Sequence, residues 1–199
     1  MKKLLWFTAV VIGFLALPSL VAADSSYGSG AYGSCQYSSC SISISSTSTV
    51  NLNITPTTAG RCTVNSDAVS VLTDNTNGYT LTLANSSTNT SLVNGANTVT
   101  QSSGSIASPT TLTANKWGFR VDSLGSFGSG PTTSQTNIAI PSTTFAGVPA
   151  SNATAATIAN TAVPADPAVT TTVWYGACID TSVPSGTYTT NVTYTATAN

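Results

Sequence analysis

The chain has 199 residues and a formal net charge of −1; only 6% of its residues are charged, and histidine and glutamate are absent. Five basic residues are too few to neutralise a row of phosphates, which excludes nucleic acid as a partner. Without histidine a nucleophilic serine has no ordinary general base, and no Ser-x-x-Lys motif replaces it, so we expect neither an enzyme nor a bound cofactor.

Residues 1–23 have the pattern of a signal peptide. Lys2 and Lys3 precede an apolar run from Leu4 to Leu17, and Val21-Ala22-Ala23 fits the small-residue rule for cleavage. The apolar run is shorter than a membrane span requires, so we expect cleavage after Ala23 and no membrane span afterwards. Loss of both lysines leaves three basic residues against six aspartates, a net charge of −3. The sequence thus predicts a secreted or cell-surface protein.

Residues 24–40 are rich in Gly, Ser and Tyr, which predicts a flexible arm. Its three tyrosines are either adhesive stacking groups or part of a solvated tail. From residue 41 to residue 199 apolar and polar residues alternate, which predicts a single β domain. Threonine is abundant there and favours strands, because its branched side chain packs well on a pleated sheet.

The first half of this domain contains a strong reversal signal. Alternation from residue 42 to residue 54 and again from Cys62 onward leads to Val69 and Val71. An Asn77-Gly78 pair follows, and Tyr79, Leu81 and Leu83 alternate after it. Asn-Gly between two alternating runs predicts a β-hairpin at this point.

Further strands are expected in the second half. Trp117-Gly-Phe-Arg-Val121 has the density of a core strand, and shorter strands are expected around residues 92–93, 99, 106, 138–140 and 145–148. Residues 149–168, rich in Ala, Asn and Pro, suggest a long connection before a long strand over 169–179. Trp117 and Trp174 lie on strand patterns, which favours core positions over a ligand platform.

The C-terminal segment has the clearest strand pattern in the chain. Tyr188, Val192 and Tyr194 alternate with polar residues, so we expect the apolar set to face the core and the threonines to face outward. We expect this strand to pair with the strand over 169–179. About eight to ten short strands in all predict an all-β fold, namely a two-sheet antiparallel β-sandwich.

Two segments of the chain are similar to each other. Trp117-Gly-Phe-Arg-Val-Asp-Ser123 aligns with Tyr175-Gly-Ala-Cys-Ile-Asp-Thr181. We interpret both as core strands that end in a turn initiated by aspartate, whose side chain bonds to the backbone that follows. A Ca²⁺ site that uses Asp122 and Asp180 is the alternative, but no loop has the dense acidic spacing of strong calcium sites, and no metal site is predicted.

Four cysteines, at positions 35, 40, 62 and 178, occur in a chain with an export signal. An even number in an exported protein favours disulfides, and four cysteines allow three pairings. Cys35 and Cys40 are close neighbours, whereas Cys62 and Cys178 lie in predicted strands, so we predict the pairs 35–40 and 62–178. A zinc site is the alternative, but Cys-x-x-Cys spacing is absent.

Two stretches resemble the motifs of WxL-type cell-surface domains. Asn77-Gly-Tyr-Thr-Leu-Thr-Leu83 resembles the first motif, and the stretch from Gly186 to Ala196 resembles the C-terminal one. Tyr79-Thr80-Leu81 and Tyr194-Thr195-Ala196 stand where that family has Trp-x-Leu. The resemblance implies an Ig-like β-sandwich that associates non-covalently with the Gram-positive cell wall. The segments around Trp117 and Tyr175 are also similar to uncharacterised exported β-proteins of bacteria with very small genomes, which have no known activity.

Two functions follow as hypotheses. The first is a non-catalytic, exported cell-surface module that associates with an envelope polymer or a surface protein, with self-association included. The second is a structural subunit of a pilus-like fibre or surface coat, because the C-terminal strand also resembles the last strand of pilin and spore-coat-type subunits. Such subunits assemble by β-strand exchange.

Overall fold

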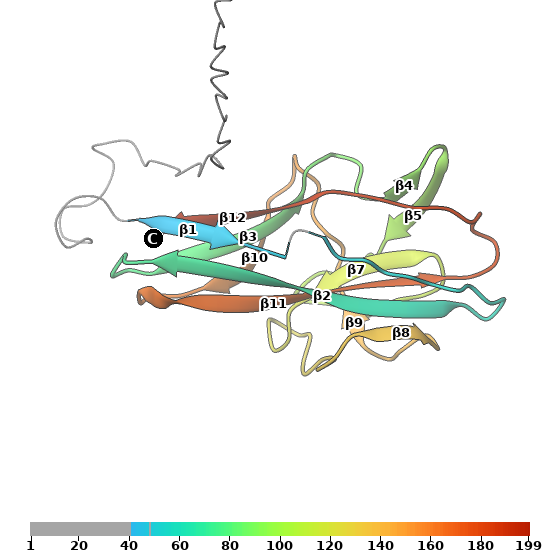
Figure 1. The fold of residues 1–199 in the computed structure, drawn as a ribbon, viewed down its shortest axis with the longest axis horizontal. Coiled ribbons are helices and arrows are strands. Elements are labelled where there is room, and N and C mark those ends of the chain that lie inside the picture. Colours follow the sequence, from blue (N-terminus) through green and yellow to red (C-terminus); the bar gives the residue numbers. More distant parts are fainter. Residues whose placement is uncertain (1–40, 48) are drawn as a thin grey trace, which may run out of the picture.

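A computed structural model of the protein describes residues 41–47 and 49–199 (Figure 1). The described residues form strands, turns and loops and include no helix, which confirms the predicted all-β class. Within these ranges, accordingly, no helix has the length and hydropathy needed to cross a membrane. The expected signal peptide (residues 1–23) and arm (residues 24–40, with Cys35 and Cys40) lie outside the described residues.

The larger sheet has seven strands and is built around two long neighbours, β2 (Arg61–Thr73) and β11 (Ala165–Ile179). Its strand order is β1-β2-β11-β7-β5-β4, with β8 also paired to β2. The other members are β1 (Ile42–Ser45), β4 (Leu92–Asn94), β5 (Asn97–Gln101), β7 (Lys116–Arg120) and β8 (Gln135–Ile138). The pairs are antiparallel except for β5 with β7, which run parallel.

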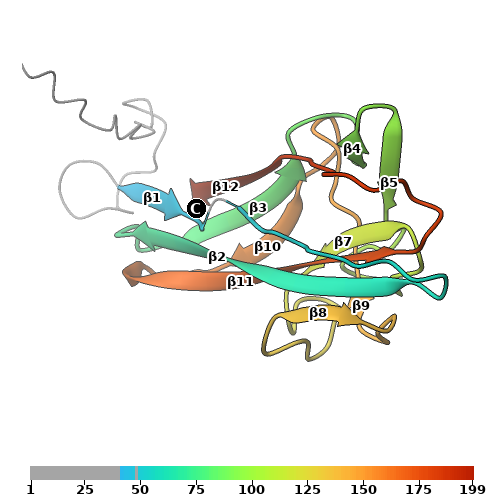
Figure 2. The same ribbon diagram turned by 45° about the vertical axis from the view of Figure 1, so that its right-hand side comes forward.

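Two smaller sheets lie on opposite sides of the β2–β11 pair. One contains β10 (Ala156–Asn160), β3 (Tyr79–Asn85) and β12 (Val192–Ala198), and the other contains β6 (Thr110–Thr111) and β9 (Thr144–Phe145). Figures 1 and 2 show β3 and β12 on one side of β2 and β11, and β8 and β9 on the other. The predicted two-sheet antiparallel sandwich is not confirmed in this form, because a third sheet and a parallel pair are present.

Alternation along β11 divides its side chains between two hydrophobic clusters. Val173, Tyr175 and Ala177 face the main core, which they share with Leu81 of β3. Trp174 and Cys178 point to the opposite face of the sheet, into a smaller cluster with Phe145. Successive side chains of a strand point to opposite faces, so this half of β11 is buried on both. Trp117 and Trp174, 2% and 6% exposed, therefore lie in different cores.

The Asn77-Gly78 turn does not close a hairpin, contrary to the sequence-based prediction. The turn itself forms: the Gly78 N–H donates to the Asn75 carbonyl at 2.9 Å, and the φ of Gly78 is +76°. However, β2 pairs with β1, β8 and β11, whereas β3 pairs with β10 and β12. The chain crosses from one sheet to the other, because β2 and β3 bury their apolar faces against each other across the core.

Two further expectations are wrong. The last strand was expected beside residues 169–179 but pairs with β3 instead, and it begins at Val192, with Thr189 in an isolated bridge to Val93. Residues 149–168, expected to be a connection, contain β10 and the start of β11. Ile158 is the buried residue of β10, 2% exposed, and its single apolar position was too weak a periodic signal.

The predicted disulfide between Cys62 and Cys178 is present. The two cysteines lie directly opposite each other on β2 and β11, with their Cα atoms 4.0 Å apart, and both side chains are fully buried. The bridge thus links neighbouring strands within one sheet, unlike the inter-sheet disulfide of immunoglobulin domains.

Gly118 and Gly176 face each other across β7 and β11 and leave room for the ring of Phe145. A Cβ at Gly176 would lie 2.8 Å from two ring carbons of Phe145. Glycine at this position therefore lets β9 pack directly on the larger sheet, on the same face as the disulfide.

Candidate functional site

The structure brings the two motif stretches side by side in the smaller sheet. On β3 and β12, Leu81 lies opposite Ala196 and Tyr79 lies opposite Ala198. Tyr79 and Leu81 are fully buried, so these motif side chains form core rather than an exposed binding surface. Tyr188 precedes β12, is half-buried, and donates from its hydroxyl to the Pro184 carbonyl at 2.9 Å.

The outward side of β10, β3 and β12 is a surface of hydroxyl and small side chains, which we call the hydroxyl face. Two rows cross the three strands in register, Thr157–Thr82–Thr195 and Asn160–Thr80–Thr197, and Ala84 lies opposite Thr193. None of these strands carries a charged residue. The middle residues of the two motif triplets, Thr80 and Thr195, belong to this face, which presents many hydrogen-bonding groups without charge.

A groove of about 570 Å³ lies at the side of the molecule, where β11 and β10 both have open edges. We call it the lateral groove. It is lined by Val121, Asp122, Ser123 and Leu124 after β7, by Ile158, Ala159 and Asn160 of β10, and by Thr170, Thr171 and Thr172 of β11.

The edge of β11 in this groove carries unpaired backbone groups. Strand β7 pairs with β11 only from Trp174 onward, and no other described strand covers Thr170 to Val173 on that side. The backbone of Phe119 bonds to Ala146 on the far side of β7, and the Cys178 carbonyl accepts from the Asn115 N–H. The backbone N–H and C=O groups of the even-numbered residues of β11 therefore point toward β7. By continuation of the strand, the N–H and C=O groups of Thr170 and Thr172 point into the groove.

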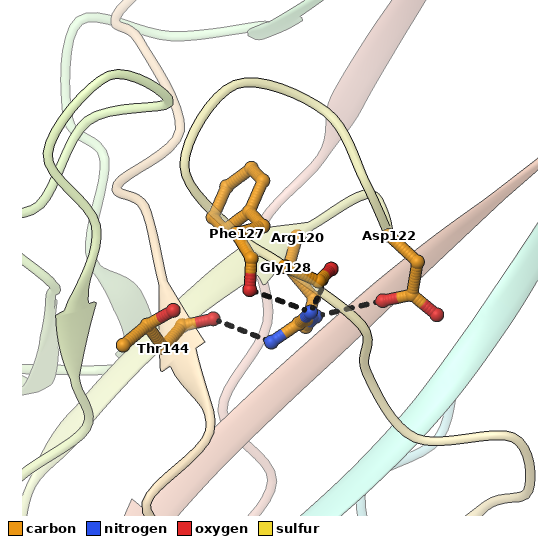
Figure 3. A network of polar contacts seen from close by, with 5 residues as sticks. All are labelled: Arg120, Asp122, Phe127, Gly128 and Thr144. Atoms are coloured by element: carbon orange, nitrogen blue, oxygen red, sulfur yellow. Dashed lines mark hydrogen bonds and ion pairs between the residues drawn. The ribbon is translucent and has the colours of Figure 1, made fainter.

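A buried arginine fixes the chain that borders the groove, as Figure 3 shows. Arg120 is 1% exposed, and its Nε donates to the Asp122 carboxylate at 2.9 Å. Its two terminal nitrogens donate to the carbonyls of Thr144, Phe127 and Gly128, each at 3.1 Å. The guanidinium group therefore ties the loop after β7 to β9. Gly130 is required beside it, because a Cβ there would lie 2.6 Å from Nε of Arg120.

One buried hydroxyl lies close to the groove. Tyr79 is fully buried, and burial raises the pKa of its hydroxyl. This hydroxyl is near the Thr171 side chain but does not reach the geometry of a hydrogen bond with it. Thr171 is also one of the residues that line the groove.

A second polar cluster links the two larger sheets inside the core. The hydroxyls of Tyr175 on β11 and Tyr194 on β12 are 2.7 Å apart. Asp67, 4% exposed, interacts with Tyr194 and accepts from the Thr47 N–H at 2.9 Å. Burial raises the pKa of both tyrosines, and the nearby Asp67 charge adds to this in each case. The hydrogen bond with Tyr194, by contrast, lowers the pKa of Tyr175.

The Ca²⁺ site considered for Asp122 and Asp180 is wrong. Strands β7 and β11 are adjacent but antiparallel, so the two aspartates lie at opposite ends of the pair. Asp180 instead accepts from the Ser182 hydroxyl and N–H and from Asn115, and these bonds lower its pKa. It thus starts a turn as expected, whereas Asp122 pairs with Arg120. The described residues contain no group of three or more possible metal ligands.

Sequence reasoning missed the roles of Arg120, Asp67 and Tyr175. Arg120 and Asp67 each stand inside an apolar strand pattern, and an ionisable residue there is the available signal of a buried polar contact.

Comparisons with protein-family models, curated proteins and solved structures find no match for this chain.

Proposed function

We propose that the protein is an exported, non-catalytic cell-surface module that associates with an envelope polymer or a surface protein. In this proposal its fold is a variant of the Ig-like or WxL-like antiparallel sandwich, with β10, β3 and β12 as one layer. The signal-peptide pattern supports the location, and the resemblance of the β3 and β12 stretches to WxL motifs supports the class.

The hydroxyl face carries this proposal. Its rows of threonines are uncharged, and three of them on β12 (Thr193, Thr195 and Thr197) are exposed. Hydroxyl groups both donate and accept hydrogen bonds, which suits the hydroxyl and amide groups of an uncharged envelope polymer. The motif tyrosines contribute indirectly, because they anchor the sheet in the core.

A pull-down with purified cell walls and intact cells tests the proposal. Thr193→Lys and Thr195→Lys place a long charged side chain on the hydroxyl face and should reduce the bound fraction severalfold. Thr172→Lys makes the same change at an exposed site on the larger sheet and should bind like the wild type. A wild-type protein that binds neither walls nor cells contradicts the association, and equal binding by all variants contradicts the assigned face.

A structural subunit is the second candidate, and the outer edge of β12, which no described strand pairs with, favours it. This strand has seven residues without charge, proline or bulge, which are the usual protections against pairing with another chain. Residues 44–46 lie beside its first half, so Ala196 and the residues after it form the more open part of the edge. The backbone groups of Asn191 and Asn199 bond to residues on the β3 side, at Ser86 and Gly78. Backbone groups of successive residues alternate in direction along a strand, so those of Val192, Tyr194 and Ala196 point away from β3. Filaments in electron micrographs of the purified exported chain would favour assembly, and a monomer in size-exclusion chromatography favours the surface module.

A further inference from the structure

The outer edge of β12 is a template for one more strand. Strand β12 lies at the end of its sheet, and β3 is its only partner among the described strands. The N–H and C=O groups of Tyr194, Ala196 and Ala198 point away from β3. Because nothing in the strand itself protects this edge, its backbone can pair with a further extended segment.

Strand β1 limits how much of the edge such a segment can reach. Residues 44–46 and residues 192–194 together line a groove of about 310 Å³. Figures 1 and 2 show β1 and β12 side by side. The second half of β12 does not border this groove, so the accessible part of the edge is centred on Ala196.

The same groove contains an apolar side chain that the fold leaves uncovered. Ile44 lies opposite the fully buried Val71 of β2, yet Ile44 itself is 42% exposed. A strand added beside β12 would lie against this groove and remove part of the Ile44 side chain from water, which is favourable. The edge therefore offers a partner apolar area in addition to backbone hydrogen bonds.

The composition of the edge suits a second copy of the same strand. When a strand pairs with itself across a two-fold axis, residues near the axis lie opposite themselves or their close neighbours. A charged residue there would face its own charge, which destabilises a strand pair. Strand β12 carries no charge, and its core-side residues after Tyr194 are the small Ala196 and Ala198. The open edge of β11 is less accessible to a folded sheet, because β10 and residues 121–124 border it.

We propose that two copies of the protein pair through their β12 edges, antiparallel to each other and about a two-fold axis at Ala196. The Ala196 N–H of each copy donates to the Ala196 carbonyl of the other, and Tyr194 lies opposite Ala198 of the second copy. The two smaller sheets thereby become one continuous sheet. Because the same edge of both copies is used, assembly stops at the dimer.

This register also joins the threonine rows of the two copies. Thr195 lies opposite Thr197 of the second copy, so the row Thr157–Thr82–Thr195 continues into the row that ends at Thr197. The dimer thus doubles the hydroxyl face. The inference uses the same edge as the structural-subunit hypothesis but predicts a closed pair in place of a fibre. It does not depend on envelope binding.

Analytical ultracentrifugation of the exported chain over a concentration series tests the pairing. The wild type should change from monomer to dimer as its concentration rises, without larger species. Ala196→Pro removes an N–H that points away from β3, so the fold should persist while the dimer Kd rises by about tenfold or more. Thr172→Pro is the matched control, because it removes an unpaired N–H from the edge of β11 and should dimerise like the wild type. Near-UV circular dichroism checks that both variants are folded.

Charge variants test the register without proline. Thr195 and Thr197 are half-buried or exposed on the outward side of β12, so substitution there preserves its pairing with β3. Thr195→Lys/Thr197→Lys should weaken the dimer, because like charges then face each other across the axis. Thr195→Asp/Thr197→Asp should weaken it in the same way. An equimolar mixture of the two should form a heterodimer at least as tight as the wild-type dimer.

Four results would overturn the proposal. They are a wild type that stays monomeric up to its solubility limit, a dimer that Ala196→Pro leaves intact, a mixture of charge variants that stays monomeric, and species that grow beyond the dimer. Slow exchange of the Ala196 amide at every concentration of a monomeric wild type would assign the edge to another segment of the same chain. None of these measurements uses cell walls, so their failure is distinct from failure of envelope binding.

Discussion

The hydroxyl of Tyr175 lies 2.7 Å from the hydroxyl of Tyr194, and this contact joins the larger sheet to the C-terminal strand. The two residues belong to β11 and β12, which share no backbone pairing. Asp67 of β2 lies beside the pair, so three strands from two sheets meet at one polar cluster within the core.

Tyr194→Phe should lower the free energy of unfolding by about 1 to 2 kcal/mol, because it leaves the buried Tyr175 hydroxyl without its partner. Tyr194→Ala should cost about 2 to 4 kcal/mol, since packing against the core is lost too. Thr193→Ala, at the exposed neighbouring position, should change stability by less than about 0.5 kcal/mol. Urea denaturation measures all three, and equal midpoints for the two Tyr194 variants and Thr193→Ala would contradict the role of the pair.

Stability should decrease at alkaline pH. Burial raises the pKa of Tyr175 and Tyr194 above the unfolded value of about 10, so the folded state holds these protons more tightly. Their contribution is complete below about pH 10 and is lost as the pH rises toward the folded-state pKa. Urea midpoints at a series of pH values should decline above about pH 10. A Tyr175→Phe/Tyr194→Phe double variant should decline less steeply, and a parallel decline would show that other groups are responsible.

Arg120→Met should destabilise the fold by about 3 to 5 kcal/mol, because it leaves three carbonyls and the partly exposed Asp122 carboxylate without their donor. Arg120→Lys should not restore stability, since an ammonium group cannot reproduce the planar fork of the guanidinium. Lys116→Met also removes a positive charge from β7, but at an exposed hydrogen bond to Thr100, and should cost less than about 1 kcal/mol. Thermal unfolding that ranks Lys116→Met with Arg120→Met would contradict the structural role of Arg120.

A Cys62→Ala/Cys178→Ala variant should lose up to about 4 to 5 kcal/mol, the chain-entropy value for so long a loop. The sequence separation is 116 residues, and both cysteines are fully buried, so reductant should act only after unfolding. Thiol labelling with and without denaturant measures this. Non-reduced peptide mapping should also give the predicted 35–40 pair, and peptides that join Cys35 to Cys62 or Cys40 to Cys178 would refute the pairing.

Local patterns in the sequence were sufficient to predict several of the strands and their buried faces, although they missed β10 and the start of β11. The alternation of Val192 and Tyr194 with exposed threonines appears in β12 as expected, since side-chain direction in a strand has a period of two. The Cys62–Cys178 pair followed from an even cysteine count and from the placement of both residues in strands. Even the turn at Gly78 forms where the Asn-Gly signal places it.

Partner choice, by contrast, was decided only by the tertiary structure. A turn signal reverses the chain without specifying whether the next strand pairs with the last one or crosses the core, so Tyr79 enters the opposite sheet. The same limit hid the lateral groove, which exists because β7 stops pairing with β11 at Trp174. Arg120 is buried because carbonyls from Thr144 and Phe127 converge on it from distant segments. Such contacts depend on packing across the whole chain, which periodicity within one segment does not encode.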